Sequence, residues 1–338
     1  MSNNHIAEWF NLSEATRKNI IEQTSQKIGL RPFAVEKDWW VVNTLNLIFS
    51  LSCAEHLVFK GGTSLSKAWN IIERFSEDID LAISREFLGF ENELTKSQVK
   101  KLREKSCKFI SEVFFNELKK SFDDNGFQGV KLDLIERNAN DTDPIKIEIA
   151  YTSLLEANPY LPSRVLIEIG SRSLMEPKTV RSFNSFVSVQ FKDQSFASPS
   201  LSIPVVNPER TLLEKIFLLH EEFQNEPKKI KVERMSRHHY DITKLMESQF
   251  GAIALSDSDL FNSIVKHRKH INFLNYVDYS KHVRGKLNII PPEWLLPDWE
   301  KDYNQMKEEM IYGDAPTFDG LMKEIANINN IINGMKTE

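Results

Sequence analysis

Two aspartates separated by one residue are the side chains of this sequence best suited to chemistry. Asp78 and Asp80 flank Ile79 and are followed by the apolar residues 81–83. A β-strand turns alternate side chains to one face, so a strand here would place both carboxylates together. Two like charges at that spacing are costly unless a cation lies between them, and hard carboxylate oxygens favour Mg²⁺ or Mn²⁺. The pair therefore predicts a divalent-metal site.

A glycine-rich turn precedes these aspartates. Gly61, Gly62, Thr63 and Ser64 interrupt an apolar run, and residues 65–74 are expected to form a helix. Glycine lets backbone N–H groups approach an anion closely, and the start of a helix adds partial positive charge. A phosphate site beside a metal site is what nucleotidyl transfer requires. Each feature alone is also common in an ordinary turn or at an exposed strand end.

The complete segment from Val58 to Ile83 resembles motif I of the DNA polymerase β-like nucleotidyltransferase superfamily. Its order of GGTSL, helix and RFSEDIDLA is most similar to the AbiEii/AbiGii-type toxin family, in which the phosphate-binding turn is written GGT. The spacing from Thr63 to Asp78 is longer than in the simplest form of the motif. The resemblance implies an α+β fold, namely a polymerase β-like nucleotidyltransferase core with a mixed β-sheet flanked by helices.

The resemblance also implies a third carboxylate in the metal site, for which the chain offers two glutamates. Glu148 in IKIEIA and Glu168 in VLIEIGSR both lie between apolar residues, so strand alternation does not choose between them. The family pattern of a small residue pair, an arginine and a proline after the glutamate favours Glu168, because Arg172 and Pro177 follow it. Glu148 stays the alternative. An exposed ion pair is the ordinary interpretation of either, most of all for Glu148 beside Lys146.

The metal ligands Asp78, Asp80 and Glu168 are expected to converge within about 4–6 Å, close enough to share ions. Glu148 is then expected to lie farther away.

The segment PERTLLEKIFLLH, residues 208–220, predicts a helix. Its apolar stripe leaves Glu214 and Lys215 outside the core, and consists of Leu212, Ile216 and Leu219. An exposed lysine on a helix is usually only solvated. The family resemblance implies that Lys215 points at the phosphates of the nucleotide, a role that suits a compact ammonium charge, and that Glu214 orients it.

The segment SRHHYDI, residues 236–242, resembles the family pattern SRHxYD. The resemblance implies that Asp241 belongs to the active site and that Arg237 binds a phosphate or pairs with Asp241. An aspartate that caps a helix is an almost equal alternative. A surface position is the ordinary interpretation of His238 and His239, and no zinc site is predicted because CxxC and HExxH spacings are missing from the sequence.

The order of elements predicts two domains. Residues 1–206 form the expected nucleotidyltransferase core with N-terminal helices, and residues 207–338 form a mainly helical domain that contributes Lys215 and Asp241 to a catalytic cleft between the domains. The C-terminal segments also resemble the family, so the resemblance covers nearly the whole chain. Periodicity predicts helices over residues 12–50 and 95–120, and strands over residues 130–135, 145–150, 165–169 and 186–191.

Composition limits the class of protein. The 338 residues carry a net charge of −5, which argues against indiscriminate binding of nucleic acid. Two basic segments, residues 228–239 and 266–270, are nevertheless candidates for an RNA contact. With two cysteines, no apolar run long enough for a membrane span and no signal segment, a soluble cytoplasmic protein without a disulfide framework is expected.

These features predict a Mg²⁺-dependent enzyme that moves a nucleoside monophosphate from an NTP to an acceptor hydroxyl. The resemblance implies a toxin of a toxin–antitoxin or phage-defence pair, with the 3′ end of tRNA as acceptor and an antitoxin encoded separately. One alternative keeps the fold and transfers NMP to a protein hydroxyl. A second alternative is a catalytically idle module that senses nucleotides.

Overall fold

The computed structural model describes residues 4–91, 93–135, 139, 141–156 and 162–334 of the chain. The chain divides into two compact units. The first contains residues up to 68 together with residues 75–206, and the second contains residues 69–74 together with those from 207 onward. The short segment 69–74 therefore belongs to the second unit, whereas the sequence interpretation had placed it in the first.

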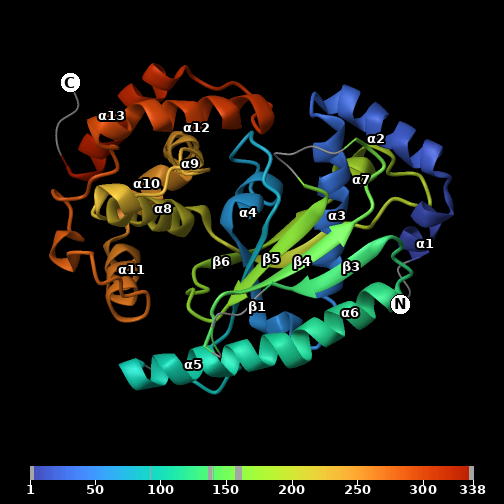
Figure 1. Cartoon of the computed structure of the whole chain (residues 1–338), viewed down its shortest axis with the longest axis horizontal. Coiled ribbons are helices and arrows are strands. Elements are labelled where there is room, and N and C mark those ends of the chain that lie inside the picture. Colours follow the sequence, from blue (N-terminus) through green and yellow to red (C-terminus); the bar gives the residue numbers. More distant parts are fainter. Residues whose placement is uncertain (1–3, 92, 136–138, 140, 157–161, 335–338) are drawn as a thin grey trace. The chain divides into compact units, whose positions relative to one another are not determined.

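A mixed β-sheet forms the centre of the first unit (Figure 1). In the described part of the chain its seven strands lie in the order β3-β4-β5-β2-β1-β7-β6. The pairs β1–β7 and β2–β5 are parallel and the other neighbouring pairs are antiparallel. The strands are β1 (Leu57–Lys60), β2 (Ile79–Ile83), β3 (Val130–Leu134), β4 (Ile145–Tyr151), β5 (Arg164–Gly170), β6 (Lys178–Phe183) and β7 (Leu201–Val206).

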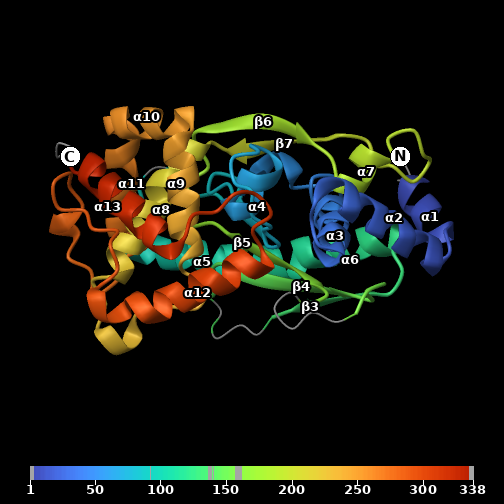
Figure 2. The same cartoon turned by 90° about the horizontal axis from the view of Figure 1, so that it is seen from above.

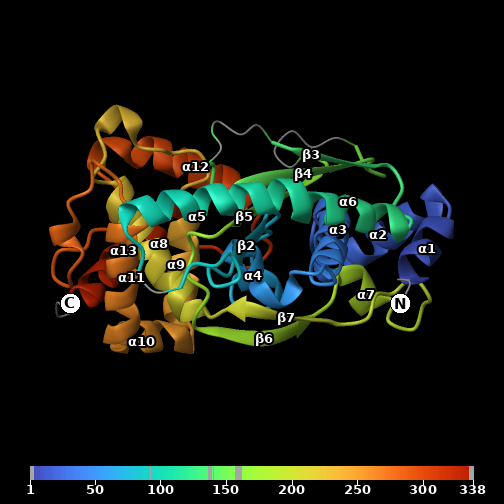
Figure 3. The ribbon, with the colours of Figure 1, turned by 90° about the horizontal axis from the view of Figure 1, so that it is seen from below.

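Helices flank this sheet, and local sequence signals fix several of their ends. Ser13 caps α2 through its side chain, Gly29 ends α2 in the left-handed conformation, and Thr95 begins α5 with a complete capping box. A π-helical turn, Ile110–Phe114, joins α5 to α6, and Figure 3 shows the two as one nearly continuous helix beside the sheet. The helices are α1 (Asn4–Asn11), α2 (Glu14–Ile28), α3 (Pro32–Ile48), α4 (Gly61–Lys67), α5 (Lys96–Phe109), α6 (Phe115–Asp124) and α7 (Phe186–Gln190).

The second unit is mainly helical. Helices α8, α9 and α10 pack on one another and α13 packs on α9, an arrangement that Figure 2 shows from above. Arg74, from the short segment 69–74, forms a β-bridge with Ile311 in this unit. The helices are α8 (Pro208–Glu222), α9 (Arg237–Glu247), α10 (Gln249–Ser256), α11 (Ser258–His270), α12 (Leu296–Glu309) and α13 (Phe318–Ile332). No helix among the described residues is both long and apolar enough to cross a membrane.

The α+β fold with a mixed sheet and flanking helices is confirmed, but two local predictions are wrong. Residues 186–190 form helix α7 instead of a strand, because the Ser185 side chain caps it by accepting from the Ser188 N–H. The helix expected at residues 65–74 begins already at Gly61 and ends at Lys67.

The sequence interpretation also missed two strands. Strand β6 is mostly polar and lies at the edge of the sheet, so it shows little apolar alternation. Strand β7 contains Pro204, which cannot donate to a sheet and which lowers a strand prediction. Both strands lie on the side of the sheet away from β2 and β5.

Candidate active site

A row of four charged residues crosses the sheet of the first unit. Asp80 on β2 faces Lys60 on β1 and Glu168 on β5 in the strand register, and Glu168 faces Lys146 on β4. Residues paired in register turn their side chains to the same face, so the charges follow one another as plus, minus, minus, plus. The Lys146 ammonium lies 2.6 Å from Glu168 Oε1. Lysines at both ends therefore offset the repulsion between the two central carboxylates.

Lys60 was not singled out from the sequence, although it directly precedes the two glycines of the phosphate turn. The only available signal was its place at the end of an apolar strand, where the side-chain alternation continues from Val58.

Gly61 places the start of helix α4 directly against Asp80. A Cβ atom on Gly61 would lie 2.0 Å from Asp80 Oδ2, and the φ angle of Gly61 is +80°. Both observations require glycine at this position. The predicted phosphate turn and the predicted metal ligand are therefore in contact.

Thr63 and Ser64 use their hydroxyl groups within the protein. Thr63 Oγ1 donates to the carbonyl oxygen of Asp78 at 2.5 Å, and Ser64 Oγ donates to the carbonyl oxygen of Gly61 at 2.8 Å. Both side chains are buried. The Thr63 contact fastens α4 to the residue that precedes β2, so any phosphate contact made by this turn would come from backbone N–H groups.

The two candidate third carboxylates occupy different places in the sheet. Glu168 lies on the strand next to Asp80, whereas Glu148 on β4 is separated from β2 by the whole of β5. Both glutamates are ion-paired. Glu148 binds Arg164, and Lys146 binds Glu168 instead of its near neighbour Glu148. The strand order thus favours Glu168 by position.

The predicted convergence of three carboxylates is not what the structure shows. Among the described residues, no group of three or more His, Cys, Asp or Glu side chains is arranged to hold a metal ion. The donor set still fits Mg²⁺ or Mn²⁺, because magnesium in nucleotide enzymes is commonly held by one or two carboxylates together with substrate phosphates. Asp78 and Asp80 supply two such groups at the end of one strand.

In the second unit, Asp241 is the centre of a buried charge network. Its carboxylate receives Arg74 Nε at 2.6 Å, Arg74 Nη2 at 2.8 Å and Lys215 Nζ at 2.8 Å. His238 Nδ1 lies 3.3 Å from the same lysine nitrogen. Asp241 is 0% exposed, Arg74 is 1% exposed and Lys215 is 8% exposed. The bidentate arginine and the ammonium hold the carboxylate in one orientation.

The electrostatics of this network follow from its burial. Burial alone would raise the pKa of Asp241, but Arg74 and Lys215 outweigh it and hold that pKa well below its usual value. Burial lowers the pKa of Lys215, Asp241 opposes this effect, and Arg74 and Arg237 add to it. Burial likewise lowers the pKa of His238, helped by the charge of Lys215. His238 is therefore neutral at physiological pH.

Three sequence interpretations in this region are wrong. Lys215 is buried, because α8 is covered on nearly every side and not only along its apolar stripe. Asp241 does not cap a helix, because α9 begins at Arg237 and Asp241 lies one turn inside it. His238 and His239 are buried, and His239 is held between the Trp299 indole N–H and the Ile289 carbonyl oxygen.

Two further residues, Glu214 and Arg74, have partners that the sequence analysis did not predict. Glu214, predicted to orient Lys215, accepts a hydrogen bond from Arg210 Nε at 3.0 Å. Arg74 was missed as a site residue, although it lies inside the segment that resembles motif I. Nothing in a local pattern shows that it meets an aspartate 167 residues later.

The two basic segments each carry exposed lysines and a cation held in an ion pair. Lys228, Lys229 and Lys231 are exposed, and Lys229 pairs with the exposed Glu226 at 2.9 Å. In the second segment Arg268 is committed to the buried Glu221, which also binds His282 at 2.9 Å. Lys266 and Lys269 of the second segment are also exposed, so both segments remain candidates for binding an anion.

Comparison with protein families decides which class of enzyme this is. A family profile described as "Nucleotidyl transferase AbiEii toxin, Type IV TA system" matches residues 48–324, which is most of the chain. The chain belongs to this AbiEii family. It is thus a nucleotidyltransferase, and membership implies an NTP substrate and an antitoxin partner. Nucleotidyltransferases generally use divalent metal ions, in keeping with the paired aspartates of β2.

Comparison with solved structures found distant similarities. The chain is 13% identical to the protein JHP933 from Helicobacter pylori, with a TM-score of 0.42 over 86% of this chain and 90% of that one. It is also 13% identical to a candidate nucleotidyltransferase from H. pylori, with a TM-score of 0.43 over 90% of this chain and 96% of that one. A comparison with curated protein sequences found no match.

Proposed function

We propose that this AbiEii-family enzyme transfers a nucleoside monophosphate from an NTP to the 3′ end of a tRNA and releases pyrophosphate. The observation that carries the proposal is the contact between Gly61 and Asp80, in a chain that belongs to a nucleotidyltransferase family. A phosphate-binding turn and a metal-binding carboxylate must be adjacent for nucleotidyl transfer, because the metal bridges phosphate oxygens.

Asp78 and Asp80 are the residues that would hold Mg²⁺, and Glu168 is proposed to join them near the acceptor hydroxyl. The metal supplies charge neutralisation at the phosphates and lowers the pKa of an attacking hydroxyl. Glu168 reaches this role only after Lys146 releases it, because the two side chains are ion-paired. The backbone of Gly61, Gly62, Thr63 and Ser64 is proposed to bind the triphosphate.

Lys215 is proposed to bind the triphosphate through its ammonium group and to stabilise the charge that develops during transfer. Asp241 positions Lys215, and Arg74 in turn fixes Asp241 through two hydrogen bonds. Burial leaves the ammonium of Lys215 poorly solvated, which lowers its pKa and strengthens its attraction for an entering phosphate. Arg237, at the start of α9, is proposed as a second phosphate ligand.

The acceptor is proposed to be tRNA, bound in part by the exposed lysines Lys228, Lys229 and Lys231. We propose that transfer takes place in the cytoplasm, where NTPs and tRNA occur together, and that a separately encoded antitoxin restrains it. Phage defence is a natural use of such a toxin.

The direct test is incubation of the protein with each labelled NTP, Mg²⁺ or Mn²⁺, and total RNA. Label is expected at the 3′ end of tRNA, and Asp80→Asn should abolish it. Asp133→Asn is the matched control, because Asp133 is a half-exposed aspartate on β3 of the same sheet and pairs with Lys131. Label in protein instead of RNA would support NMP transfer to a protein hydroxyl, and absence of label with every NTP would contradict transfer altogether.

Growth of cells supplies a second readout. Expression should slow growth, and Asp80→Ala should relieve the effect at equal expression, since loss of a metal ligand removes the chemistry. An equally toxic Asp80→Ala variant would show that toxicity comes from binding or aggregation.

A further inference from the structure

A small cavity lies among the N-terminal helices of the first unit. Its volume is about 220 Å³, and it is enclosed by α1, α2, α3 and the segments around residues 128–129 and 152–154. We call it the aromatic pocket and define it by the eight side chains that matter for its chemistry: Trp9, Phe10, Glu14, Arg17, Glu36, Trp39, Trp40 and Gln128. The charge row of the sheet and the Asp241 network contribute no side chain to it.

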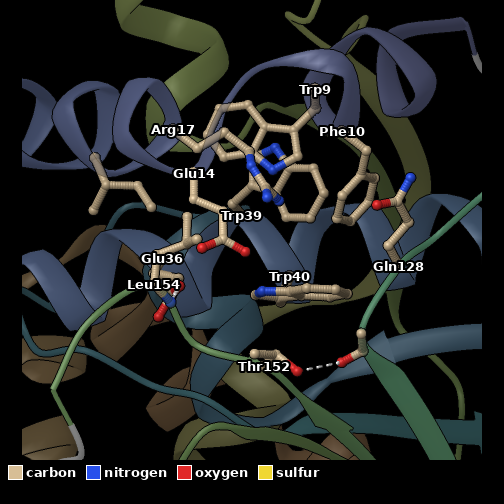
Figure 4. A pocket seen from close by; sticks show the side chains of 12 residues that line it. Trp9, Phe10, Glu14, Arg17, Glu36, Trp39, Trp40, Gln128, Thr152 and Leu154 are labelled. Carbon is tan, nitrogen blue, oxygen red and sulfur yellow. Dashed lines mark hydrogen bonds between the residues drawn. The ribbon is translucent and has the colours of Figure 1, made fainter.

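Four aromatic rings give the pocket flat apolar walls. Tyr151 stacks on one side of the Trp40 indole at 4.7 Å between ring centroids, and Trp39 meets Trp40 edge-on at 5.2 Å. Trp9 stacks on Trp39 at 5.0 Å. Figure 4 shows the Trp40 ring edge-on with Trp9 and Phe10 above it, and the Phe10 ring centre lies 6.3 Å from that of Trp40. A cavity with aromatic walls suits a planar apolar ring.

Hydrogen-bond donors and acceptors both line the aromatic pocket. The Arg17 guanidinium lies 5.2 Å from the Phe10 ring centre, and its buried Nε atom has no hydrogen-bond acceptor among the described residues. An unsatisfied buried donor is costly, so an entering group that carries an acceptor would be favoured there. Glu14 and Glu36 line the cavity and add carboxylate acceptors (Figure 4).

Glu36 retains accepting capacity although it is already bonded. It is buried, and it accepts from the Ser153 hydroxyl at 2.5 Å and from the Leu154 N–H at 2.7 Å. A carboxylate has about four acceptor positions, so about two remain for a ligand. The bonds to residues 153 and 154 also hold this carboxylate rigidly at the wall of the pocket.

These groups discriminate among classes of ligand. An ammonium or guanidinium guest carries no acceptor, so it would leave the buried Nε of Arg17 unsatisfied. Drug-sized ligands fill pockets of about 300–1,000 Å³, so this smaller cavity suits a single ring system instead of a complete nucleotide. Among the bases, guanine combines acceptors at O6 and N7 with adjacent donors at N1 and N2, whereas adenine offers one donor group beside N7.

We propose that the aromatic pocket binds a guanine base beside Trp40, with Arg17 donating to its acceptor edge and the carboxylates of Glu14 and Glu36 accepting from its donor edge. The base belongs either to a free nucleotide or to a single-stranded RNA. The inference does not depend on the transferase chemistry, because it uses neither the metal site nor Lys215.

The test is binding of guanosine to the full chain, without metal or NTP, followed through tryptophan fluorescence, since three of the six tryptophans line the pocket. Guanosine should quench the fluorescence and bind about 10-fold or more tightly than adenosine. Glu14→Gln keeps the size of an exposed side chain, and Arg17→Lys keeps its charge but removes Nε. Each should weaken guanosine binding about 5- to 10-fold, because each removes a charge-assisted hydrogen bond.

Glu22→Gln is the matched control on α2, because Glu22 lies outside the pocket and pairs only loosely with Lys18 at 4.0 Å. It should leave guanosine binding unchanged. Equal binding of guanosine and adenosine, absence of binding, or guanosine binding that neither Glu14→Gln nor Arg17→Lys weakens would overturn the proposal. The last result would place the nucleoside elsewhere on the chain.

Two further probes identify the source of the base. GMP and a single-stranded RNA tetramer with one guanine are compared with guanosine, and a tetramer with adenine in its place serves as the control. Tighter binding of the guanine tetramer than of GMP supports an RNA base, whereas tighter binding of GMP supports a free nucleotide. A tetramer that binds equally well with adenine, together with GMP that does not bind, would contradict a guanine site.

Discussion

The buried network around Asp241 predicts that substitutions of two contacting residues, Asp241 and Lys215, have very different effects on the free energy of unfolding. Asp241→Asn removes the negative charge that pairs with Arg74 and Lys215, while it keeps the shape of the side chain. Breaking a buried ion pair by removing one partner costs about 3–5 kcal/mol, because the other partner stays buried and charged. We expect a loss of that size in the free energy of unfolding of the second unit.

Lys215→Met should cost far less. Asp241 keeps both hydrogen bonds from Arg74, so its carboxylate remains compensated. The lost hydrogen bond to a charged group is worth about 1.5–3 kcal/mol, but the variant also relieves the burial of an ammonium whose pKa is already lowered. The net loss should be about 1 kcal/mol, although both substitutions should abolish nucleotidyl transfer.

Thermal unfolding and hydrogen exchange of the α8 and α9 amides measure the difference. A gap of about 3 kcal/mol corresponds to about 6–12 °C in the melting temperature of a unit of this size. Lys244→Met on α9 is the matched control, because that lysine pairs with the half-exposed Glu247 and should change stability very little. Equal losses for Asp241→Asn and Lys215→Met, or a larger loss for the lysine variant, would refute this account of the network.

Three other substitutions test separate parts of the structure. Gly61→Ala should lower both stability and transfer by displacing the neighbouring aspartate, whereas Gly29→Ala, at a similar positive φ with open space around it, should cost only about 1 kcal/mol and leave activity intact. Burial lowers the pKa of His239 to about 4, so between pH 6.5 and pH 4 the unfolded chain binds a proton that the folded chain does not. The free energy of unfolding should therefore fall by on the order of 3 kcal/mol as the pH drops from about 6.5 to about 4. His239→Gln should flatten this part of a profile of melting temperature against pH. Lys146→Met removes the ion-pair partner of Glu168 and should reduce the Mg²⁺ concentration for half-maximal activity several-fold. Arg164→Met removes the partner of Glu148 and should leave that concentration unchanged. The opposite pattern would transfer the role of third metal ligand to Glu148.

The sequence by itself determined the features that depend on short spacing. The period of two around Asp80 predicted strand β2, and the glycine pair before it marked the turn into a helix. These signals act over a few residues, where backbone geometry alone fixes which side chains share a face. The α+β class followed for the same reason, because it required only the order and type of the stronger elements.

Tertiary packing decided everything that depends on long-range contact. Only the sheet shows that Glu168 lies on the strand next to Asp80 and that Glu148 lies one strand farther away, since β5 and not β4 neighbours β2. A polar edge strand such as β6 is stabilised by its neighbour and carries little pattern of its own. No local rule contains this information, because the partners of a strand are chosen by the whole sheet.

Burial of Lys215 is the clearest case. Helix α8 has one apolar stripe, and such a stripe predicts only one buried face of a helix. Asp241 and Arg74 then cover a second face, and their charges make it possible to bury a lysine that would otherwise stay in water. The sequence carried all three residues, but only the folded chain brings Arg74 and Asp241 together across 167 positions, since the compensation of a buried charge depends on its neighbours in space.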